Sequence, residues 1–207
     1  VAQDDLRLRF ATALALADEN DGSVVYCYMP EVDKAGHKRG VDSARWLAAL
    51  EDVDAAFAAR IPDDVGVVIT ADHGMIDVPR TRHVLLGEKD PRWQGVAQLG
   101  GEPRMLHVYA EPGVDVAKLA NRWQDHCDKT AVVSTRNDAI AAGIFGAVAP
   151  EVAARIGDVI VAARGLWAFY DDTLDDKGGQ HMVGQHGSIT PEELMVPMLR
   201  AGAFAND

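Results

Sequence analysis

The sequence contains few cysteines and few basic residues, and each of these shortages excludes some classes of protein. Only Cys27 and Cys127 occur among 207 residues, too few and too far apart for a disulfide framework or a thiolate metal cluster. Twenty Lys and Arg against 32 Asp and Glu give a formal charge of -12. Such a surface repels nucleic acid, so we expect no stable nucleic-acid binding. Any phosphate chemistry must then depend on locally placed cations such as metal ions.

Long apolar runs are also missing. No stretch approaches the roughly 20 apolar residues of a membrane-spanning helix. The first ten residues lack the basic and apolar regions of a signal peptide. We therefore expect no membrane partner and a cytoplasmic location. The chain starts with Val1 rather than Met and soon enters an expected helix, so we also expect it to be a piece of a longer protein.

What the chain does contain is ordinary globular composition, with 48% hydrophobic and 25% charged residues. Apolar periodicity and turn residues predict helices that alternate with short strands. This alternation favours an α/β fold, a mostly parallel sheet with helices on both faces. We expect one domain over residues 1–207, with a small insertion around residues 86–165. The expected helices cover residues 4–20, 41–61, 114–127, 137–145 and 150–155, with another after Thr190; the expected strands cover residues 23–29, 66–71, 105–109, 131–134 and 158–162; residues 86–102 and 171–179 are expected loops.

Three short segments place aspartate and histidine beside these elements. Asp33 and His37 follow the first expected strand, Asp72 and His73 end the second, and His186 lies between glycines before the last helix. Ligands of α/β sheets bind at the carboxyl ends of strands, so we expect three loops to meet at one sheet edge. An unpaired Asp72 buried at a strand end would be costly, which favours a ligand there. Five carboxylate and imidazole ligands suit two divalent ions better than one.

The remaining histidines have simpler interpretations. Asp125-His126 is also an adjacent pair, but consecutive residues of a helix point about 100° apart, so we treat it as a chance pair. His107 and His126 are expected to be structural. His181 is interpreted as a structural or surface residue, with contact to a ligand as the alternative. His83 is similar, although two neighbouring arginines make phosphate contact conceivable.

The three segments carry a family resemblance. YMPEVDKAGHKRG, VVITADHGM and GQHGSITPEELMVP resemble the metal-binding motifs of the alkaline phosphatase superfamily, in particular its type I phosphodiesterase/nucleotide pyrophosphatase branch. The resemblance implies an alkaline-phosphatase-like fold and two divalent ions, zinc by preference and manganese as the alternative. It assigns Asp33, His37 and His186 to one ion and Asp72 and His73 to the other. The implied reaction is hydrolysis of phosphodiester or nucleotide pyrophosphate bonds through a phospho-enzyme, with a phosphate ester or nucleotide as small-molecule substrate.

One part of the family pattern is missing. The family's Ser or Thr nucleophile lies before the first of these motifs, where Thr12 falls inside an expected helix and Ser23 begins an expected strand. We therefore assign no catalytic residue to this chain. We expect it to be the C-terminal part of the catalytic domain, inactive alone, with the missing N-terminal segment or a second chain as partner. The alternatives are a phosphomonoesterase, phosphonate hydrolase or phosphomutase of the same superfamily, or a non-catalytic metal-binding module.

Overall fold

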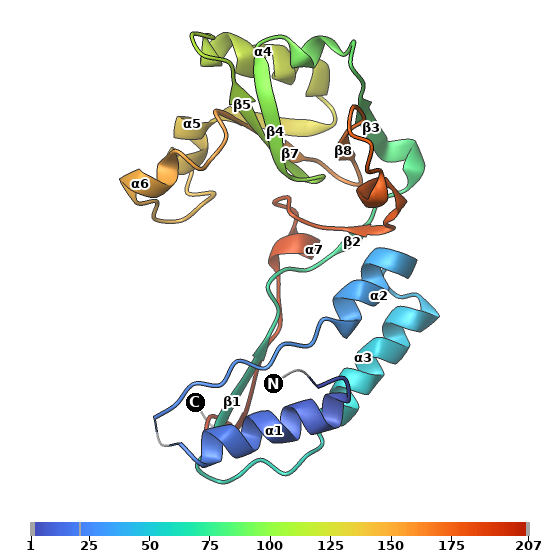
Figure 1. Cartoon of the computed structure of the whole chain (residues 1–207), viewed down its shortest axis with the longest axis vertical. Coiled ribbons are helices and arrows are strands. Elements are labelled where there is room, and N and C mark those ends of the chain that lie inside the picture. The colour runs from blue at the N-terminus through green and yellow to red at the C-terminus, as the bar shows by residue number, and fades with distance from the viewer. Residues whose placement is uncertain (1–2, 21, 206–207) are drawn as a thin grey trace. The chain divides into compact units, whose positions relative to one another are not determined.

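The computed structural model describes residues 3–20 and 22–205, and the chain divides into two compact units (Figure 1). Unit 1 comprises residues 1–74 and 195–207, and unit 2 comprises residues 75–194. The expected insertion, residues 86–165, falls inside unit 2. The boundary between Gly74 and Met75 lacks the polar or proline-rich linker that usually marks two domains, which is why one domain was expected. No helix among the described residues is long and apolar enough to cross a membrane.

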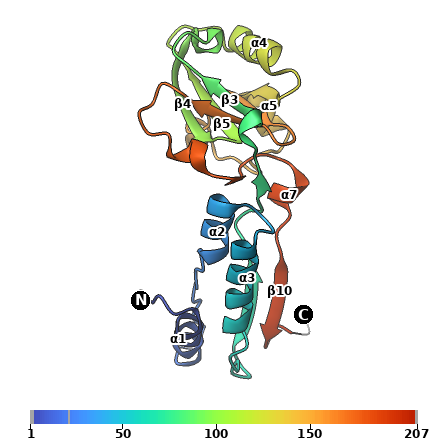
Figure 2. The same cartoon turned by 90° about the vertical axis from the view of Figure 1, so that its right-hand side faces the viewer.

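Unit 1 consists of three helices and a two-stranded antiparallel sheet. Its elements are α1 (Leu6–Asp18), α2 (Glu31–Arg39), α3 (Ala44–Ala56), β1 (Gly66–Thr70) and β10 (Met198–Gly202). Helix α1 begins where predicted, because the Asp5 carboxylate accepts a hydrogen bond from the Leu8 amide at 2.9 Å. Helices α1 and α2 both pack against α3, which Figure 2 shows from the side.

The apolar core of unit 1 is small. Phe10, Leu14 and Val65 are buried together, and the Phe10 ring meets Phe57 edge-on at 5.0 Å between centroids. Other large apolar side chains of this unit stay exposed. They include Leu8, Val24, Tyr26, Val68, Met195, Met198 and Leu199.

The strand expected over residues 23–29 is wrong. The segment runs without regular secondary structure into α2 (Figure 1). Strand structure requires a partner for the backbone N–H and C=O groups, and none of the described strands pairs with this segment. Val24 is 95% exposed and Tyr26 is 83% exposed. Residues 23–29 have the β-branched and aromatic pattern of a strand. No strand in the described part of the chain pairs with them and buries them.

Unit 2 is built around a four-stranded sheet in the order β4-β5-β7-β6. Its helices and strands are β2 (Ile76–Asp77), β3 (His83–Leu86), β4 (Val96–Glu102), β5 (Met105–Ala110), α4 (Val116–Cys127), β6 (Ala131–Thr135), α5 (Arg136–Ala141), α6 (Pro150–Ala153), β7 (Val159–Ala163), β8 (Ala168–Asp171), β9 (Gly184–Gln185) and α7 (Pro191–Leu194). Short 3₁₀ turns occupy Arg80–Arg82, Pro91–Trp93 and Gly178–His181. Most predicted helices and strands of this unit are confirmed within a few residues.

The α/β class is confirmed, but the pairing is not mostly parallel. Within the described residues only β3 and β8 pair in parallel, and every other strand pair is antiparallel. The expected loop over residues 86–102 ends in β4, which forms a hairpin with β5. A two-residue turn, Pro103-Arg104, suffices for that connection, whereas parallel pairs need long crossovers. Alternation of helix and strand along the chain therefore did not determine strand direction.

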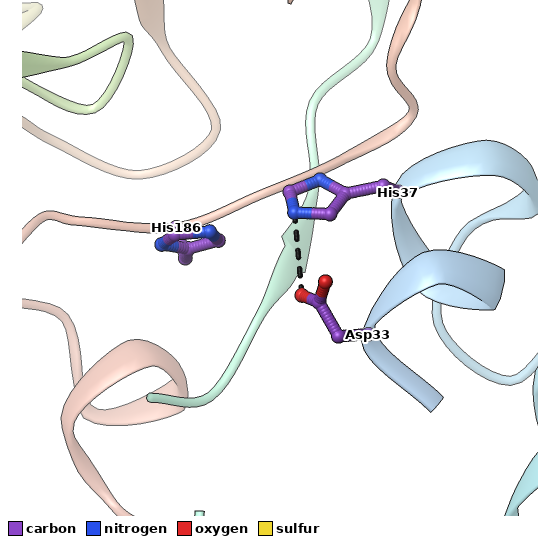
Figure 3. A group of neighbouring side chains, drawn as sticks. All are labelled: Asp33, His37 and His186. Atoms are coloured by element: carbon purple, nitrogen blue, oxygen red, sulfur yellow. Dashed lines mark ion pairs between the residues drawn. The ribbon is translucent and has the colours of Figure 1, made fainter. Parts of the chain in front are cut away.

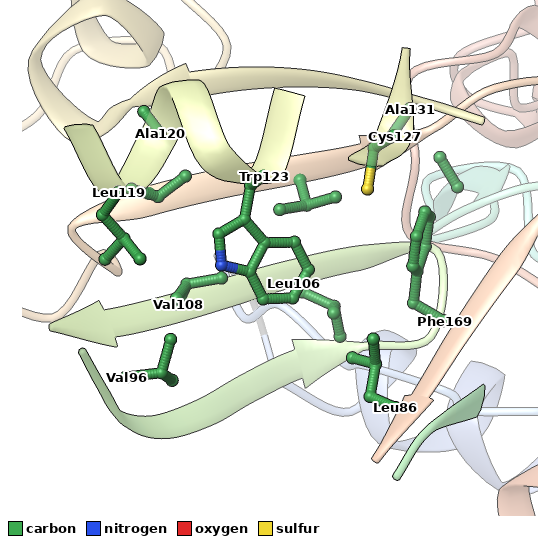
Figure 4. Packing of buried hydrophobic residues seen from close by; sticks show 13 residues of the cluster. Leu86, Val96, Leu106, Val108, Leu119, Ala120, Trp123, Cys127, Ala131 and Phe169 are labelled. Carbon is green, nitrogen blue, oxygen red and sulfur yellow. The ribbon is translucent and has the colours of Figure 1, made fainter. Parts of the chain in front are cut away.

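The main core of unit 2 lies between this sheet and α4. Trp123, Leu119 and Cys127 of α4 are fully buried against Val108 of β5 and Val161 of β7 (Figure 4). All five residues of β7 are buried, as expected for a central strand covered on both faces. Cys127 is thus a core residue.

A buried ion pair joins the β4–β5 turn to α7. The Arg104 guanidinium donates to both oxygens of Glu193, at 3.0 and 2.6 Å, and both side chains are at most 1% exposed. Arg104 also donates to the carbonyl oxygens of Gly165 and Trp167. Burial alone would raise the pKa of Glu193, but hydrogen bonds from Arg104, Thr190 and the Ser188 amide outweigh it and lower the pKa.

We predict that Glu193→Gln lowers the free energy of unfolding by about 3–5 kcal/mol at pH 7, because it leaves the Arg104 charge buried without its partner. Lys118→Met is the matched control. It removes the exposed Lys118–Asp115 pair, and we expect a far smaller loss, because solvent screens an exposed pair. Urea unfolding measures both. The lowered pKa means that the contribution of Glu193 is complete above about pH 4.3 and is lost as the pH falls further. Equal losses in the two variants would contradict the importance of the buried pair.

Candidate metal centre

Helix α2 carries the first two candidate ligands. Asp33 and His37 lie four residues apart, one helical turn, so both side chains share a face. The His37 Nε2 atom is 3.2 Å from Asp33 Oδ1 (Figure 3). The loop expected here is therefore wrong. Acidic residues in the first turn and basic ones in the last complement the helix dipole, and Gly40, with a φ of 90°, ends the helix.

The Asp33 carboxylate has an oxygen that its surroundings do not satisfy. Oδ1 is buried and accepts no hydrogen bond from any described residue, although His37 Nε2 is close. The two atoms are near one another without the alignment of a hydrogen bond. A buried carboxylate oxygen without a donor is costly, and a cation shared with the adjacent imidazole would remove that cost. These two residues therefore fit a metal ion.

The second pair follows β1. Asp72 and His73 come directly after the strand ends at Thr70, and His73 Nε2 is 3.8 Å from Asp72 Oδ1. The expectation that Asp72 is buried is wrong, since its side chain is 72% exposed: β1 is only partly covered. His73 Nδ1 is 2.8 Å from the Gly74 carbonyl oxygen. A carbonyl can only accept, so Nδ1 carries the proton, and Nε2 of the neutral ring has the lone pair that a metal needs.

Tyr28 of unit 1 lies just before α2, and the sequence analysis gave its side chain no role in the site. Desolvation raises the pKa of its phenol, and the negative charges of Asp72 and Asp33 raise it further. Tyr28 is the first residue of the motif YMPEVDKAGHKRG, but it also falls within the strand expected over residues 23–29.

His186 belongs to unit 2 and directly follows β9 (Figure 3). Its neighbours on both sides are fixed by buried hydrogen bonds. The Gln185 amide donates to the Tyr170 hydroxyl at 3.1 Å and to the Gly179 carbonyl at 3.0 Å. The Ser188 hydroxyl donates to the Ala163 carbonyl at 2.7 Å. Gly187 has a φ of 115°, which disfavours any other residue there. The backbone that carries His186 is thus rigidly placed.

The other histidines have contacts of their own. His126 Nδ1 lies 2.8 Å from the Arg122 carbonyl oxygen on α4, which agrees with its treatment as a chance neighbour of Asp125. His107 accepts a hydrogen bond from the Gly157 amide. The His83 ring packs at a tilt against Tyr170, and His181 Nδ1 lies 3.0 Å from the Arg80 guanidinium. Burial lowers the pKa of His107 and of His83.

Two carboxylates and three imidazoles are thus the candidate ligands. Asp33 and His37 come from α2, Asp72 and His73 from the end of β1, and His186 from the segment after β9. Oxygen and imidazole nitrogen are donors that zinc accepts, and manganese accepts less selectively. Two carboxylates would neutralise about half of the charge of two divalent ions. The remaining positive charge of the two ions would attract an anionic substrate to this acidic protein.

The α/β fold is similar to that of solved proteins that act on phosphorus compounds. Human ectonucleotide pyrophosphatase/phosphodiesterase 5 has a TM-score of 0.61 at 18% identity, over 94% of this chain and 51% of that one. The murine protein, in an inactive form bound to AMP, has a TM-score of 0.57 at 16% identity, over 98% and 54% of the two chains. Phosphonoacetate hydrolase from Sinorhizobium meliloti 1021, bound to phosphonoacetate, has a TM-score of 0.60 at 19% identity, over 94% and 49%.

These similarities define an α/β protein of alkaline-phosphatase-like fold. A family model described as type I phosphodiesterase/nucleotide pyrophosphatase matches residues 2–189, and the chain belongs to that family. The chain spans about half the length of the solved proteins to which it is similar. No curated protein matches it in sequence.

We predict that metal-free His73 is protonated on Nδ1, because that atom must donate to the Gly74 carbonyl. Long-range ¹H–¹⁵N correlation spectra at pH 8 distinguish the two neutral tautomers. His126 is a suitable internal reference, since its Nδ1 also faces a carbonyl oxygen, that of Arg122. A spectrum with the His73 proton on Nε2 would contradict the assignment of that atom as a metal ligand.

Proposed function

We propose that this chain is part of a metal-dependent hydrolase of phosphodiester or nucleotide pyrophosphate bonds. The match of the family model to residues 2–189 carries the proposal. The unsatisfied Asp33 oxygen beside His37 supports its metal dependence from this chain's own geometry. The substrate is a small phosphate ester or nucleotide, in keeping with the AMP found in the murine relative.

We infer two divalent ions, zinc by preference. Asp33 and His37 would hold one ion with His186 of unit 2, and Asp72 and His73 would hold the other. Each of these side chains offers an oxygen or nitrogen ligand atom. Bound ions of this kind polarise phosphoryl oxygens and lower the pKa of a hydroxyl or water. The carbonyl of Gly74 orients His73, and the buried bonds around Gln185 and Ser188 orient His186.

The attacking hydroxyl is proposed to come from outside these 207 residues, from a further segment or a second chain. Thr12 lies inside α1 and donates to the Leu8 carbonyl at 2.7 Å, so its hydroxyl is part of the helix. Ser23 lies at the start of the irregular segment, remote in sequence from any helix start that could activate it. The chain therefore contributes metal ligands and binding surface rather than the nucleophile.

A second candidate is phosphonate hydrolysis. It is favoured by the phosphonoacetate hydrolase structure, whose TM-score of 0.60 is equivalent to that of the human phosphodiesterase, 0.61. The same ligand set would serve both reactions, because each develops negative charge on phosphoryl oxygens. A metal-binding module without catalysis is the remaining alternative.

Metal content tests the proposed centre. We expect about two zinc equivalents per chain by mass spectrometry after purification without chelator, and about one or fewer in His186→Ala, because removing a ligand weakens one site. His126→Ala is the matched control and should keep the wild-type content, since His126 lies on α4 with its Nδ1 against the Arg122 carbonyl and is not a candidate ligand. Absence of bound zinc or manganese from the wild-type chain, even after either metal is added back, would overturn the proposal.

Turnover tests the source of the nucleophile. We expect the zinc-loaded chain alone to hydrolyse bis(p-nitrophenyl) phosphate no faster than free zinc does. Release of p-nitrophenol is followed by the absorbance of its anion, with Thr12→Val as a control that removes the α1 hydroxyl. Hydrolysis by the wild-type chain that Thr12→Val abolishes would contradict the placement of the nucleophile outside these residues.

A further inference from the structure

Arg9 of α1 connects three separate segments of unit 1. Its Nη1 atom donates to both carboxylate oxygens of Glu31, at 3.0 and 3.2 Å, and to the Tyr28 carbonyl at 3.1 Å. Its Nε donates to the Gln3 carbonyl at 2.8 Å. The side chain is 17% exposed and that of Glu31 is 31% exposed, so the pair is partly shielded from water. One guanidinium thus holds the beginning of α1, the end of the irregular segment and the start of α2.

Among the described residues, no side chain caps the start of α2, where Pro30 occupies the N-cap position. The helix has nine residues, and only Ala35 and Gly36 are buried. A helix this short is marginal by itself, so its position depends on tertiary contacts. Helix α3 supplies the packing, and Glu31, the first residue of α2, supplies the link to Arg9.

We propose that Arg9 is a positioning residue for the Asp33–His37 pair. Glu31 and Asp33 share the first turn of α2, so fixing Glu31 fixes the position from which the Asp33 carboxylate projects. Arg9 is itself a cation and would not bind a metal ion. It acts through its contacts with Glu31 and with the Tyr28 backbone. The proposal rests on the proposed function only in taking the Asp33–His37 pair to bind a metal ion.

The proposed role of the Arg9–Glu31 pair differs from that of an ordinary surface ion pair. Exposed pairs contribute little to stability, and loss of one leaves the fold unchanged. A residue that orients a metal ligand changes metal affinity, commonly by about tenfold or more when it is removed. The two roles therefore predict different ratios of affinity loss to stability loss.

Zinc affinity of the full chain, measured by competition with a chelator, tests the proposal. We expect Arg9→Met to weaken zinc binding about tenfold. Arg9→Lys should recover part of the loss, because an ammonium reaches Glu31 but lacks the planar fork that also serves Tyr28 and Gln3. Arg7→Met is the matched control, as Arg7 lies on the same helix and is exposed, and it should leave the affinity unchanged.

A double-mutant cycle separates positioning from general stability. Glu31→Gln should weaken zinc binding as Arg9→Met does, and the double variant should be little worse than either. Unchanged zinc affinity in Arg9→Met would overturn the proposal, and so would a loss of affinity that Arg7→Met shares. A loss that merely follows a fall in the thermal midpoint of the metal-free chain would also overturn it.

Hydrogen exchange of the metal-free chain keeps this inference distinct from the proposed function. We expect the amides of residues 33–37 to exchange faster in Arg9→Met than in the wild type, while those of α3 stay protected. If the wild-type chain binds no metal, the proposed function fails. The hydrogen-exchange measurement still decides whether Arg9 fixes the position of α2. Equal protection of residues 33–37 in both proteins would then overturn it.

Discussion

The placement of a carboxylate and an imidazole one turn apart on α2 is the constraint on which the candidate centre depends. Asp33 and His37 lie on one face only because residues 31–39 form a helix, and that short helix is held by α3 and by the Arg9–Glu31 contact. The same arrangement leaves one Asp33 oxygen buried without a donor. A cation held by this oxygen and the adjacent imidazole would satisfy it.

In unit 2, buried hydrogen bonds rather than a helix hold the candidate ligand His186 in place. His186 lies between the two-residue strand β9 and Gly187. These two features alone would not fix the position of its imidazole. Around it, Gln185 bonds to Tyr170, and Ser188 bonds to Ala163 and to Glu193, which is itself paired with buried Arg104. Buried polar networks of this kind rigidify a backbone when every member is satisfied. In each unit, contacts of neighbouring residues thus hold the backbone that carries the candidate ligands.

Local patterns predicted much of this fold. The helices α1 and α4 and the strands β5, β6 and β7 follow from caps and apolar periodicity, and the family follows from three motifs. Strand direction, the helical state of residues 31–39 and the missing pairing of residues 23–29 did not follow, because each depends on a distant partner. The Arg104–Glu193 pair spans 89 residues and leaves no local signal. The assignment of the five ligands to two ions stays a prediction.

The most direct test of the account is X-ray absorption at the zinc edge of the zinc-loaded chain. The account predicts a first shell of nitrogen and oxygen only, at about 2.0–2.1 Å, with the outer-shell scattering of imidazole. That imidazole scattering should fall when His37 is replaced by alanine. A shell with a sulfur neighbour at about 2.3 Å, or one that His37→Ala leaves unchanged, would contradict the claim that Asp33 and His37 form the core of a metal centre.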